Sequence, residues 1–524
     1  MASVAGIDFG TLSVRVSIYS SRHGLLGMGT AEYPLNRKKD DPDHATESHA
    51  DHMQGFVEAF DRALKAAQLD GAELKALAAD ATGSTILPVD GGLEPLDDYY
   101  MWCDHRAKAE AALITETARR MGLEALAWSG GVYPAEGGFA KLLHWLRHNP
   151  EKRSRLAAVV EHVDMFPATV CGVRDPKRLS RSIAVAGPKW MWNPDLGGWP
   201  PAEFLAAVDP LFEGILAKLA GRMSRLGEPA GLLSAEWAAR LGLKPGIPVA
   251  TCGLDGHLDT LGAGIREGDV VIVLGTSAPI MALARQTRPI PGTCGAAFGA
   301  VHPDMYAIEA GLGASGDLWE AIARRAGADI GELSRGLENY RAGQTGLLRL
   351  TWDNGDRTVL VNSELGGITL GWKLTHTAQD ELFAAFEGTA LHTRIVLERL
   401  AEHGVPVRRL IIGGRVPQKN KVITRIYANV LGKPVLAPER EATGLGAAIF
   451  AFLAAGAFKT VEEAQDALCP GYRVVEPDPQ AVEVYNRLYP LYRRLYFGFG
   501  RPGESGAFGD VLAALRRIAI EVAG

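Results

Sequence analysis

Two Gly-Thr turns, each set between strand-like runs, constrain the fold of this 524-residue chain most strongly. The first, Gly10–Ser13 (GTLS), follows the run Val4–Phe9, and the second, Gly275–Ser277 (GTS), follows Val270–Leu274. A short turn between two strands forms a hairpin whose backbone N–H groups and hydroxyls can converge on one anion. The turns lie about half the chain apart, which predicts a duplicated domain pair that grips a polyphosphate. The alternative is two ordinary hairpins, because Gly-Thr is a common dipeptide.

Composition and charge exclude several classes of protein. Hydrophobic residues make up 47% of the chain and charged residues 22%, as is usual for a folded globular protein. The net charge is −6, and no basic run is long enough to follow a nucleic-acid backbone, so we expect no nucleic-acid partner. The longest apolar stretch, 447–458, is shorter than the ~20 residues that span a bilayer, so we expect no membrane partner. Five scattered cysteines without a C-x-x-C pair, and a start without a signal-like apolar core, indicate a reduced, cytoplasmic protein.

Helical patterns alternate with short buried-strand patterns throughout, which predicts α/β layers. Within them, Gly311–Gly316 has the pattern G-x-G-x-x-G, after strand-like residues 305–308 and before the helical pattern Asp317–Arg325. A glycine-rich turn at a helix N-terminus favours contact with phosphate. A dinucleotide fingerprint also needs a following strand that ends in an acidic residue, and no strand leads into Asp329 or Glu332. We interpret the segment as a nucleotide-facing turn and keep an NAD-dependent oxidoreductase as an alternative.

Asp255 follows a buried strand-like run and is flanked by glycines in the segment 251–257 (TCGLDGH). Strand ends in α/β proteins project into clefts, so Asp255 is well placed as a general base. The alternative role is to cap the helix that follows. Because the second Gly-Thr turn comes soon afterwards in the chain, we favour catalysis.

Four of these features together resemble the FGGY family of carbohydrate kinases: the Asp8–Arg15 turn, the Gly-x-Asp at 253–255, the Gly275–Ser277 turn and Gly413-Gly414. The resemblance runs from Gly6 to about Gly500. Further short stretches support it in the same order, namely 81–85, 88–90, 101–105, 130–133, 192–193, 197–198, 309–311 and 354–357. It implies an α/β, two-lobed, actin/hexokinase-like (ribonuclease H-like) fold with ATP in a cleft between duplicated domains. The expected parts are an N-terminal domain 1–265, a C-terminal domain 266–460 and a C-terminal helical extension 461–524.

The resemblance also implies an activity. It predicts an ATP-dependent kinase that phosphorylates the terminal hydroxyl of a ketopentose, L-ribulose giving L-ribulose 5-phosphate, with ATP and Mg²⁺ as cofactors. Another pentulose or a polyol (D-ribulose, xylulose, a ribitol-type compound) stays open as the acceptor, and so does a homodimer. A non-catalytic, actin-like nucleotide sensor is a further alternative, against which Asp8 and Asp255 argue, because a sensor needs no base.

The family's functional residues carry over position by position. By resemblance, Asp8 holds Mg²⁺ through water and Asp255 is the catalytic base. The residues expected at ATP are Gly10, Thr11, Ser13, Gly275, Thr276, Gly313, Asp317, Gly413, Gly414 and Gln418. Those expected at the sugar are Thr82, Gly83, Ser84, Lys189, Asp255 and Glu309. Leu12 and Arg415 depart from the family's pattern, which has a polar residue at the first position and a small one at the second.

Overall fold

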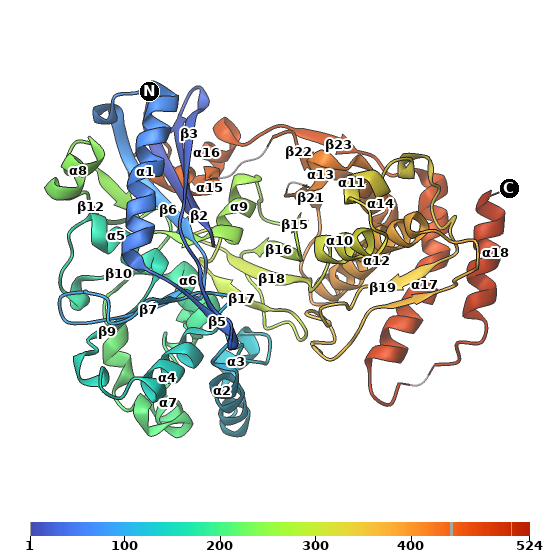
Figure 1. Ribbon diagram of the computed structural model, residues 1–524, viewed down its shortest axis with the longest axis horizontal. Coiled ribbons are helices and arrows are strands. Elements are labelled where there is room, and N and C mark those ends of the chain that lie inside the picture. The colour runs from blue at the N-terminus through green and yellow to red at the C-terminus, as the bar shows by residue number, and fades with distance from the viewer. Residues whose placement is uncertain (1, 415, 441–443, 505, 524) are drawn as a thin grey trace. The chain divides into compact units, whose positions relative to one another are not determined.

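A computed structural model of the protein describes residues 2–414, 416–440, 444–504 and 506–523. The chain divides into two compact units, each assembled from separate segments (Figure 1). Unit 1 consists of Met1–Arg266, Gly295–Ala307 and Ala442–Cys469. Unit 2 consists of Glu267–Cys294, Ile308–Glu441 and Pro470–Gly524.

The main sheet of unit 1 has seven strands among the described residues. Their order is β12 (Pro229–Leu232), β13 (Pro248–Ala250), β6 (Leu74–Ala81), β1 (Ser3–Phe9), β2 (Ser13–Ser20) and β3 (Gly24–Glu32), and β14 (Gly253–Leu254) also pairs with β6. Strand β6 runs parallel to β1, β13 and β14, whereas β1, β2 and β3 form an antiparallel meander. The parallel strands therefore end at one edge of the sheet, where their following residues gather.

The units do not coincide with the expected domain limits. Residues 442–460, expected in the C-terminal domain, and 461–469, expected in the helical extension, belong to unit 1. The reason is the packing of α15 (Leu445–Ala454), the apolar stretch noted above, against β1 and β6. The approach is so close that a Cβ atom on Gly6 would collide with the carbonyl oxygen of Gly444. The return of this helix to the first half of the chain is a long-range contact that local sequence patterns do not encode.

Two helices cover opposite faces of the main sheet. Gly29 of β3 faces α1 (His49–Ala67), because a Cβ atom there would collide with the backbone of Ala59, whereas Gly6 of β1 faces α15. In the strand register Gly29 pairs with Val16 and Gly6 pairs with Ser17. Adjacent residues on one strand point to opposite faces, so the two glycines lie on opposite faces as well. Each allows a helix to approach the sheet without a side chain between them.

The rest of unit 1 surrounds this sheet. A second sheet contains β4 (Asn36–Lys38), β5 (Asp41–Glu47), β8 (Tyr99–Tyr100), β7 (Ile86–Val89) and β9 (Ala158–Glu161), in that order, and β10 (Ser180–Ser182) pairs with β11 (Arg222–Ser224). The segment Gly295–Ala307 carries β17 (Gly295–Phe298). The remaining helices are α2 (Lys108–Met121), α3 (Glu124–Trp128), α4 (Gly138–His148), α5 (His162–Val170), α6 (Ile183–Trp190), α7 (Ala202–Val208), α8 (Ala235–Leu241), α9 (Asp255–Gly262) and α16 (Val461–Leu468).

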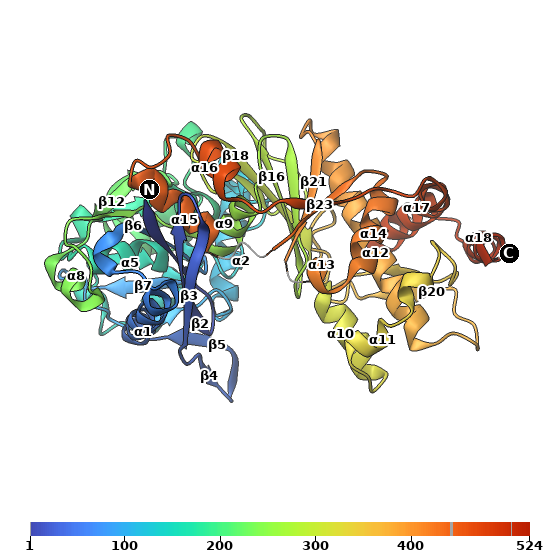
Figure 2. The same cartoon turned by 90° about the horizontal axis from the view of Figure 1, so that it is seen from above.

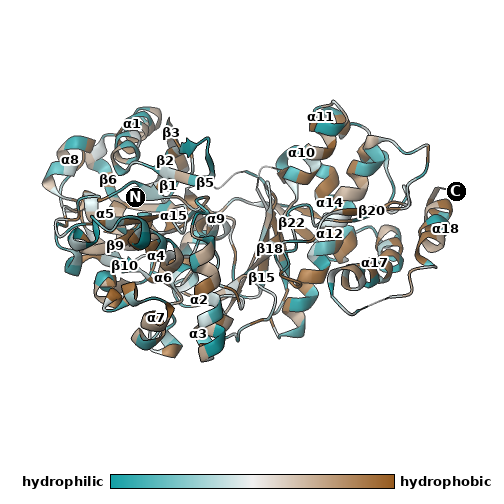
Figure 3. Cartoon of the chain, turned by 60° about the horizontal axis from the view of Figure 1, so that its bottom comes forward, coloured by the Kyte–Doolittle hydropathy of each residue, from teal (hydrophilic) through white to brown (hydrophobic). Residues whose placement is uncertain are grey.

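Unit 2 has its own sheet. Its strands follow the order β18 (Tyr306–Leu312), β16 (Ala278–Ala284), β15 (Asp269–Val273), β21 (Arg409–Gly413), β22 (Val435–Pro438) and β23 (Tyr472–Val475), and β19 (Leu348–Leu350) pairs separately with β20 (Ile368–Leu370). Strand β15 is hydrophobic along most of its length (Figure 3), as expected for a strand buried on both faces. The helices are α10 (Gly316–Arg325), α11 (Ile330–Leu333), α12 (Ala378–Glu402), α13 (Val416–Lys419), α14 (Lys421–Leu431), α17 (Pro479–Gly500) and α18 (Val511–Ala523).

Helices α12 and α14 lie side by side in unit 2 (Figure 2), and α17 packs against both. Two buried hydroxyls of α17 are hydrogen-bonded, since Tyr485 donates to Glu387 at 2.8 Å and Tyr496 donates to Asp356. Among the described residues, no helix is both long enough and apolar enough to cross a lipid bilayer.

The close approach of α1 to β3 generates a first prediction. Replacing Gly29 with alanine forces a methyl group into the helix backbone, and overpacking of this kind costs roughly 1–3 kcal/mol. We expect Gly29→Ala to lower the apparent melting temperature of the full chain. Gly91→Ala is the matched control, because a Cβ atom at Gly91 meets nothing within 4 Å and should leave the transition in place. Equal melting curves for the two variants would contradict the packing described here.

Candidate active site

Three carboxylates lie at neighbouring strand ends in unit 1. Asp8 of β1 is in register with Asp80 of β6, and Asp80 is also in register with Gly253 of β14. Asp255 follows β14 directly as the first residue of α9. The carboxyl groups of Asp8 and Asp80 are close enough that each shifts the pKa of the other. Parallel pairing therefore brings Asp8 and Asp255, which are far apart in sequence, to one edge of the sheet.

The electrostatics of this edge are dominated by negative charge. Burial raises the pKa of Asp8 to about 6, with a further contribution from Asp255, while Arg15 lowers it. The Arg15 guanidinium contacts the Asp8 carboxylate at 3.3 Å. Burial also raises the pKa of Asp80 well above its usual range and raises the pKa of Asp255. Because Asp8 and Asp255 raise the pKa of Asp80 further, this edge is an environment that a cation stabilises.

The first Gly-Thr turn, Gly10–Ser13, connects β1 to β2 and is held by two side chains from other segments. Within the turn, the Gly10 N–H donates to the Ser13 carbonyl at 3.0 Å. The Tyr33 hydroxyl donates to the Gly10 carbonyl at 2.6 Å, and the Trp102 indole N–H donates to the Thr11 hydroxyl at 2.9 Å. Leu12, where the family has a polar residue, is 58% exposed, so its side chain points away from the core.

The strip Thr82–Ser84, which we call the sugar strip, follows β6 directly. The Thr82 N–H donates to the Phe9 carbonyl at 3.2 Å, so the strip begins beside the end of β1. A Cβ atom on Gly83 would lie 2.8 Å from Leu254 and 3.1 Å from Cε of Lys189, which α6 carries. Because Asp255 follows Leu254, the structure brings the sugar strip, Lys189 and Asp255 together in unit 1.

Glu309 is the expected sugar residue that unit 1 does not contain. It lies on β18, in the part of that strand that belongs to unit 2. Its carboxylate accepts a hydrogen bond from Arg357 at 3.1 Å. The structure therefore does not bring Glu309 together with the other expected sugar residues within one unit, and its role stays a prediction.

In unit 2 the second Gly-Thr turn is bonded to the start of α10. The Gly275 carbonyl accepts from the Gly316 N–H at 2.9 Å and from the Ser315 hydroxyl at 2.8 Å. The Thr276 carbonyl accepts from the N–H groups of Ser315 and Asp317 at 3.0 and 3.2 Å. The second Gly-Thr turn and the Gly311–Gly316 segment are separate motifs in the sequence, but hydrogen bonds join them at the N-terminus of α10.

The glycine pair at the end of β21 adjoins the same turn. The Leu274 N–H donates to the Gly413 carbonyl at 3.0 Å. Gly414 has φ +90° and lies so close to the Leu274 carbonyl that a Cβ atom would sit 2.5 Å from its oxygen. Gln418 is exposed on the short helix α13, and Arg415, the other departure from the family's pattern, lies outside the described residues. Apart from Gln418, the ATP residues expected in this half of the chain are therefore neighbours in unit 2.

The G-x-G-x-x-G pattern has a packing explanation in unit 2. A Cβ atom on Gly311 would lie 2.8 Å from the Ala278 carbonyl oxygen, and one on Gly313 would lie 2.9 Å from that of Asn354. A Cβ atom on Gly316 would likewise lie 2.5 Å from the Gly275 carbonyl oxygen. The next strand after α10 is β19, and it belongs to a separate two-stranded sheet. A dinucleotide fold would return to the same sheet, so this topology argues against the NAD alternative.

Sequence reasoning missed several residues that hold these segments. They are Asp80, Tyr33, Trp102 and the buried Lys141, whose ammonium group donates to the Ser84 carbonyl at 2.6 Å. Asp80 had a signal in the sequence, because it is a lone carboxylate near the end of a buried strand, as Asp8 is. Trp102 lies in the stretch 101–105 noted for the family resemblance, but its contact with Thr11, like those of Tyr33 and Lys141, joins distant segments and had no signal in the sequence.

The chain was compared with protein-family models and with known proteins. Residues 3–262 match the N-terminal domain of the FGGY family of carbohydrate kinases, and residues 270–455 match its C-terminal domain. The ribulokinase of Geobacillus thermodenitrificans is 31% identical, over 98% of this chain and 96% of that protein.

Solved structures with the same fold include a xylulose kinase from Rhodospirillum rubrum, with a TM-score of 0.81 at 23% identity over 94% of this chain and 98% of that one. A gluconate kinase from Lactobacillus acidophilus reaches a TM-score of 0.81 at 16% identity, over 95% and 98% of the two chains. At such identities these likenesses establish the fold, which is α/β, two-domain and actin-like.

The bonds around the first turn predict how it responds to a small change. Tyr33→Phe removes the hydroxyl that donates to Gly10 and leaves the rest of the ring in place, which should cost about 1 kcal/mol. We expect faster hydrogen exchange at the amides of residues 10–13, measured by mass spectrometry of the intact chain. Exchange there as slow as in the wild type would show that Tyr33 does not hold the turn.

Proposed function

The chain belongs to the FGGY family of carbohydrate kinases, and we propose that it transfers the γ-phosphoryl group of ATP to the terminal hydroxyl of a ketopentose, with L-ribulose as the acceptor. It is a sugar kinase by family, so the proposal concerns the acceptor and the roles of individual residues. The observation that carries it is the meeting of Asp255, Lys189 and the sugar strip in unit 1 of a chain that matches a ribulokinase over nearly its full length. The relatives' printed substrate supports L-ribulose, and the same fold in xylulose and gluconate kinases means that side chains, not the fold, select the sugar.

Asp255 is proposed as the general base. Its Oδ1 accepts a hydrogen bond from the Gly256 N–H at 2.6 Å, and among the described residues Oδ2 accepts none. Oδ2 is thus available to a sugar hydroxyl. The raised pKa of Asp255 makes it a better proton acceptor, which a base that deprotonates an alcohol requires. As the hydroxyl attacks the γ-phosphorus in line, its proton passes to Asp255 and the bond to the β-phosphate oxygen breaks.

The sugar is proposed to lie against the strip Thr82–Ser84, where Lys189 donates to its hydroxyls. Lys189 is partly exposed and its side chain adjoins Gly83, so its ammonium group is available for such contacts. Sites that hydrogen-bond a sugar hydroxyl reject analogues that lack it, because their buried polar groups are then left unpaired. Glu309 is proposed as a further sugar contact, supplied by unit 2.

ATP is proposed to contact Gly10, Thr11 and Ser13 of unit 1 and the bonded turns of unit 2. In unit 2 the phosphates are proposed to lie beside the second Gly-Thr turn, where the helix dipole of α10 favours an anion, with Gly275, Thr276, Gly313 and Asp317 around them. Gly413, Gly414 and Gln418 are proposed to contact the adenosine. Phosphoryl transfer is catalysed mainly by positioning and by charge neutralisation, and these groups supply the positioning.

The residues present fit a Mg²⁺ ion that Asp8 would hold through water. Asp8 has a partly exposed carboxylate in surroundings rich in negative charge, and no cluster of three or more ligating side chains is found among the described residues. Mg²⁺ commonly keeps several waters and uses one or two carboxylates together with substrate phosphates. When bound, it would neutralise charge on the phosphates. Asp8 would hold it, and Arg15 would keep the Asp8 carboxylate oriented.

The role of Asp255 predicts the effect of Asp255→Asn. An amide cannot accept the proton, so sugar-dependent ADP release should fall by ~10²–10⁴-fold. Nucleotide binding, measured by calorimetry, should persist. The matched control is Asp259→Asn, the same change one turn further along α9 at an exposed position, which should keep most of the rate. Near wild-type turnover by Asp255→Asn would remove Asp255 from the base role.

The choice of acceptor is tested by a coupled ADP-release assay of the wild-type protein. The panel contains L-ribulose, D-ribulose, D- and L-xylulose and ribitol, and L-ribulose should show the highest kcat/KM. Phosphorus NMR of the product should place the phosphate on the terminal oxygen. A higher kcat/KM for another member of the panel would make L-ribulose the wrong acceptor, and no turnover with any of them would overturn the pentulose proposal.

A further inference from the structure

We propose that Lys141 is a positioning residue for the transfer reaction: its buried ammonium group ties the sugar strip to the loop that carries Trp102, and through Trp102 to the phosphate turn Gly10–Ser13. The inference rests on the proposed function, because it concerns the site assigned there. It assigns a role to a residue that touches neither substrate. Every contact involved lies within unit 1.

The ammonium group of Lys141 is completely buried and its hydrogen-bonding capacity is used in full. Lys141 lies on α4, with 0% of the residue exposed. Its Nζ donates to the carbonyls of Ser84 at 2.6 Å, Met101 at 2.5 Å and Tyr100 at 3.4 Å. An ammonium group has three N–H donors, so each donor has one carbonyl acceptor.

Burying the Lys141 ammonium group has a desolvation cost that a residue needed only for packing would not have. Removing an ammonium group from water is costly, and among the described residues Lys141 forms no ion pair. Burial lowers its pKa to about 8, and Asp104 and Glu161 offset part of that effect from a distance. A methionine would fill a similar volume without the desolvation cost. What only the ammonium group supplies is a simultaneous bond to three carbonyls on two segments.

The two segments joined by Lys141 both lead to the site. Ser84 ends the sugar strip and has φ +59°, a left-handed conformation that is unfavourable for a residue with a side chain and needs support from its surroundings. Met101 precedes Trp102, whose indole N–H donates to the Thr11 hydroxyl although the ring is 45% exposed. The chain of contacts from Ser84 through Lys141, Met101 and Trp102 ends on the phosphate turn.

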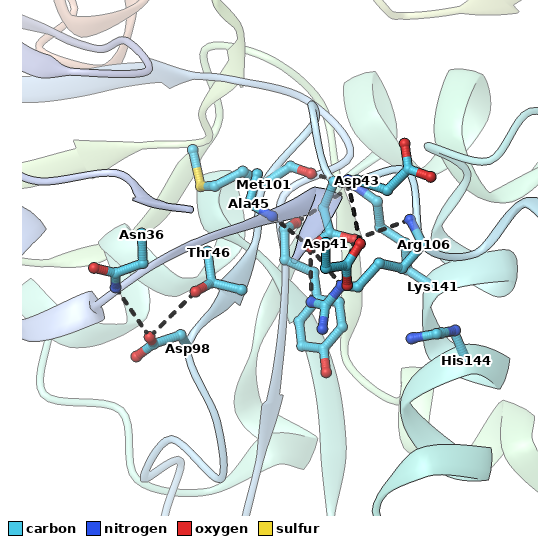
Figure 4. A network of polar contacts seen from close by, with 12 residues as sticks. Asn36, Asp41, Asp43, Ala45, Thr46, Asp98, Met101, Arg106, Lys141 and His144 are labelled. Carbon is cyan, nitrogen blue, oxygen red and sulfur yellow. Dashed lines mark hydrogen bonds and ion pairs between the residues drawn. The ribbon is translucent and has the colours of Figure 1, made fainter. Parts of the chain in front are cut away.

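Several hydrogen bonds besides those from Lys141 hold the Trp102 loop in place. Asp104, which is fully buried, accepts from the Ala45 N–H at 2.9 Å and from the Arg106 guanidinium at 2.7 Å. The Asp104 N–H itself donates to the Met101 carbonyl at 2.8 Å. Figure 4 shows Met101, Ala45 and Arg106 in this one network beside Lys141. The Trp102 loop is thus anchored to β5 without Lys141. The bond from Lys141 to Ser84 then connects the sugar strip to this loop.

The test is the steady-state kinetics of Lys141→Met. Losing the anchor should let the strip shift, and small misplacements of this kind cost up to about 100-fold in rate. We expect kcat/KM for the sugar to fall roughly 10- to 100-fold, while the KM for ATP stays unchanged, because Tyr33 still holds the phosphate turn. ATP hydrolysis without sugar should rise relative to transfer.

Two further variants separate positioning from a loss of stability. Lys218→Met is the matched control, since it also removes a lysine that donates to a carbonyl in unit 1, that of Leu156, away from the strip. It should leave both KM values unchanged. Trp102→Phe combined with Lys141→Met should be non-additive, because both act through one chain of contacts. If Lys141→Met does not fold, Lys141→Gln, which keeps two donors, carries the same measurements.

The outcomes distinguish the two proposals. If the wild type phosphorylates no pentulose, the proposed function is wrong, whatever the variants do. If the wild type is active and Lys141→Met, or Lys141→Gln in its place, lowers the melting temperature but keeps the wild-type kcat/KM for the sugar, Lys141 is a structural residue and the inference is overturned. Additive effects in the double variant would also overturn it, because the link through Trp102 would then be absent.

Discussion

The parallel pairing of β6 with both β1 and β14 is the interaction on which the unit 1 site depends. It sets Asp8, Asp80 and Asp255 side by side, although they come from three separate stretches of sequence. Burial raises the pKa of all three carboxyl groups, and Asp255 raises those of Asp8 and Asp80 further. A fold that maintains such an edge needs a compensating cation, and one arginine in contact, Arg15, compensates only part of the charge. The parallel strand pairing therefore produces both the negative charge at this edge and the site of the proposed chemistry.

The phosphate site proposed in unit 2 depends on backbone geometry rather than on side-chain charge. Gly316 and Gly414 allow their backbone segments to approach the second Gly-Thr turn and Leu274 within distances that exclude a Cβ atom. The result is a tight turn at the N-terminus of α10, where the helix dipole favours a phosphate without a basic side chain. This explains how a chain of net charge −6 can serve a highly anionic substrate.

Much of the fold and part of the site could be predicted, because the signals are local. Strand, Gly-Thr turn and strand recur in both halves, and the α/β, two-domain, actin-like fold that the family resemblance implies is confirmed. The expected domain limits differ from the compact units because α15 returns to β1, where Gly6 accepts it. The Gly311–Gly316 pattern was ambiguous in sequence, since glycines that allow close packing and glycines that bind a dinucleotide look alike.

The sequence by itself determined which residues have the chemistry for this reaction: the strand-end carboxylates Asp8 and Asp255, the glycine turns and the resemblance to a kinase family. Only the tertiary structure decided which of them are neighbours and what holds them. The contacts of Lys141 with Ser84 and of Trp102 with Thr11 join residues 57 and 91 positions apart. Such contacts depend on strand register and on the placement of helices against the sheet. Periodicity and turn composition describe only neighbours along the chain, so they carry no information about those distances.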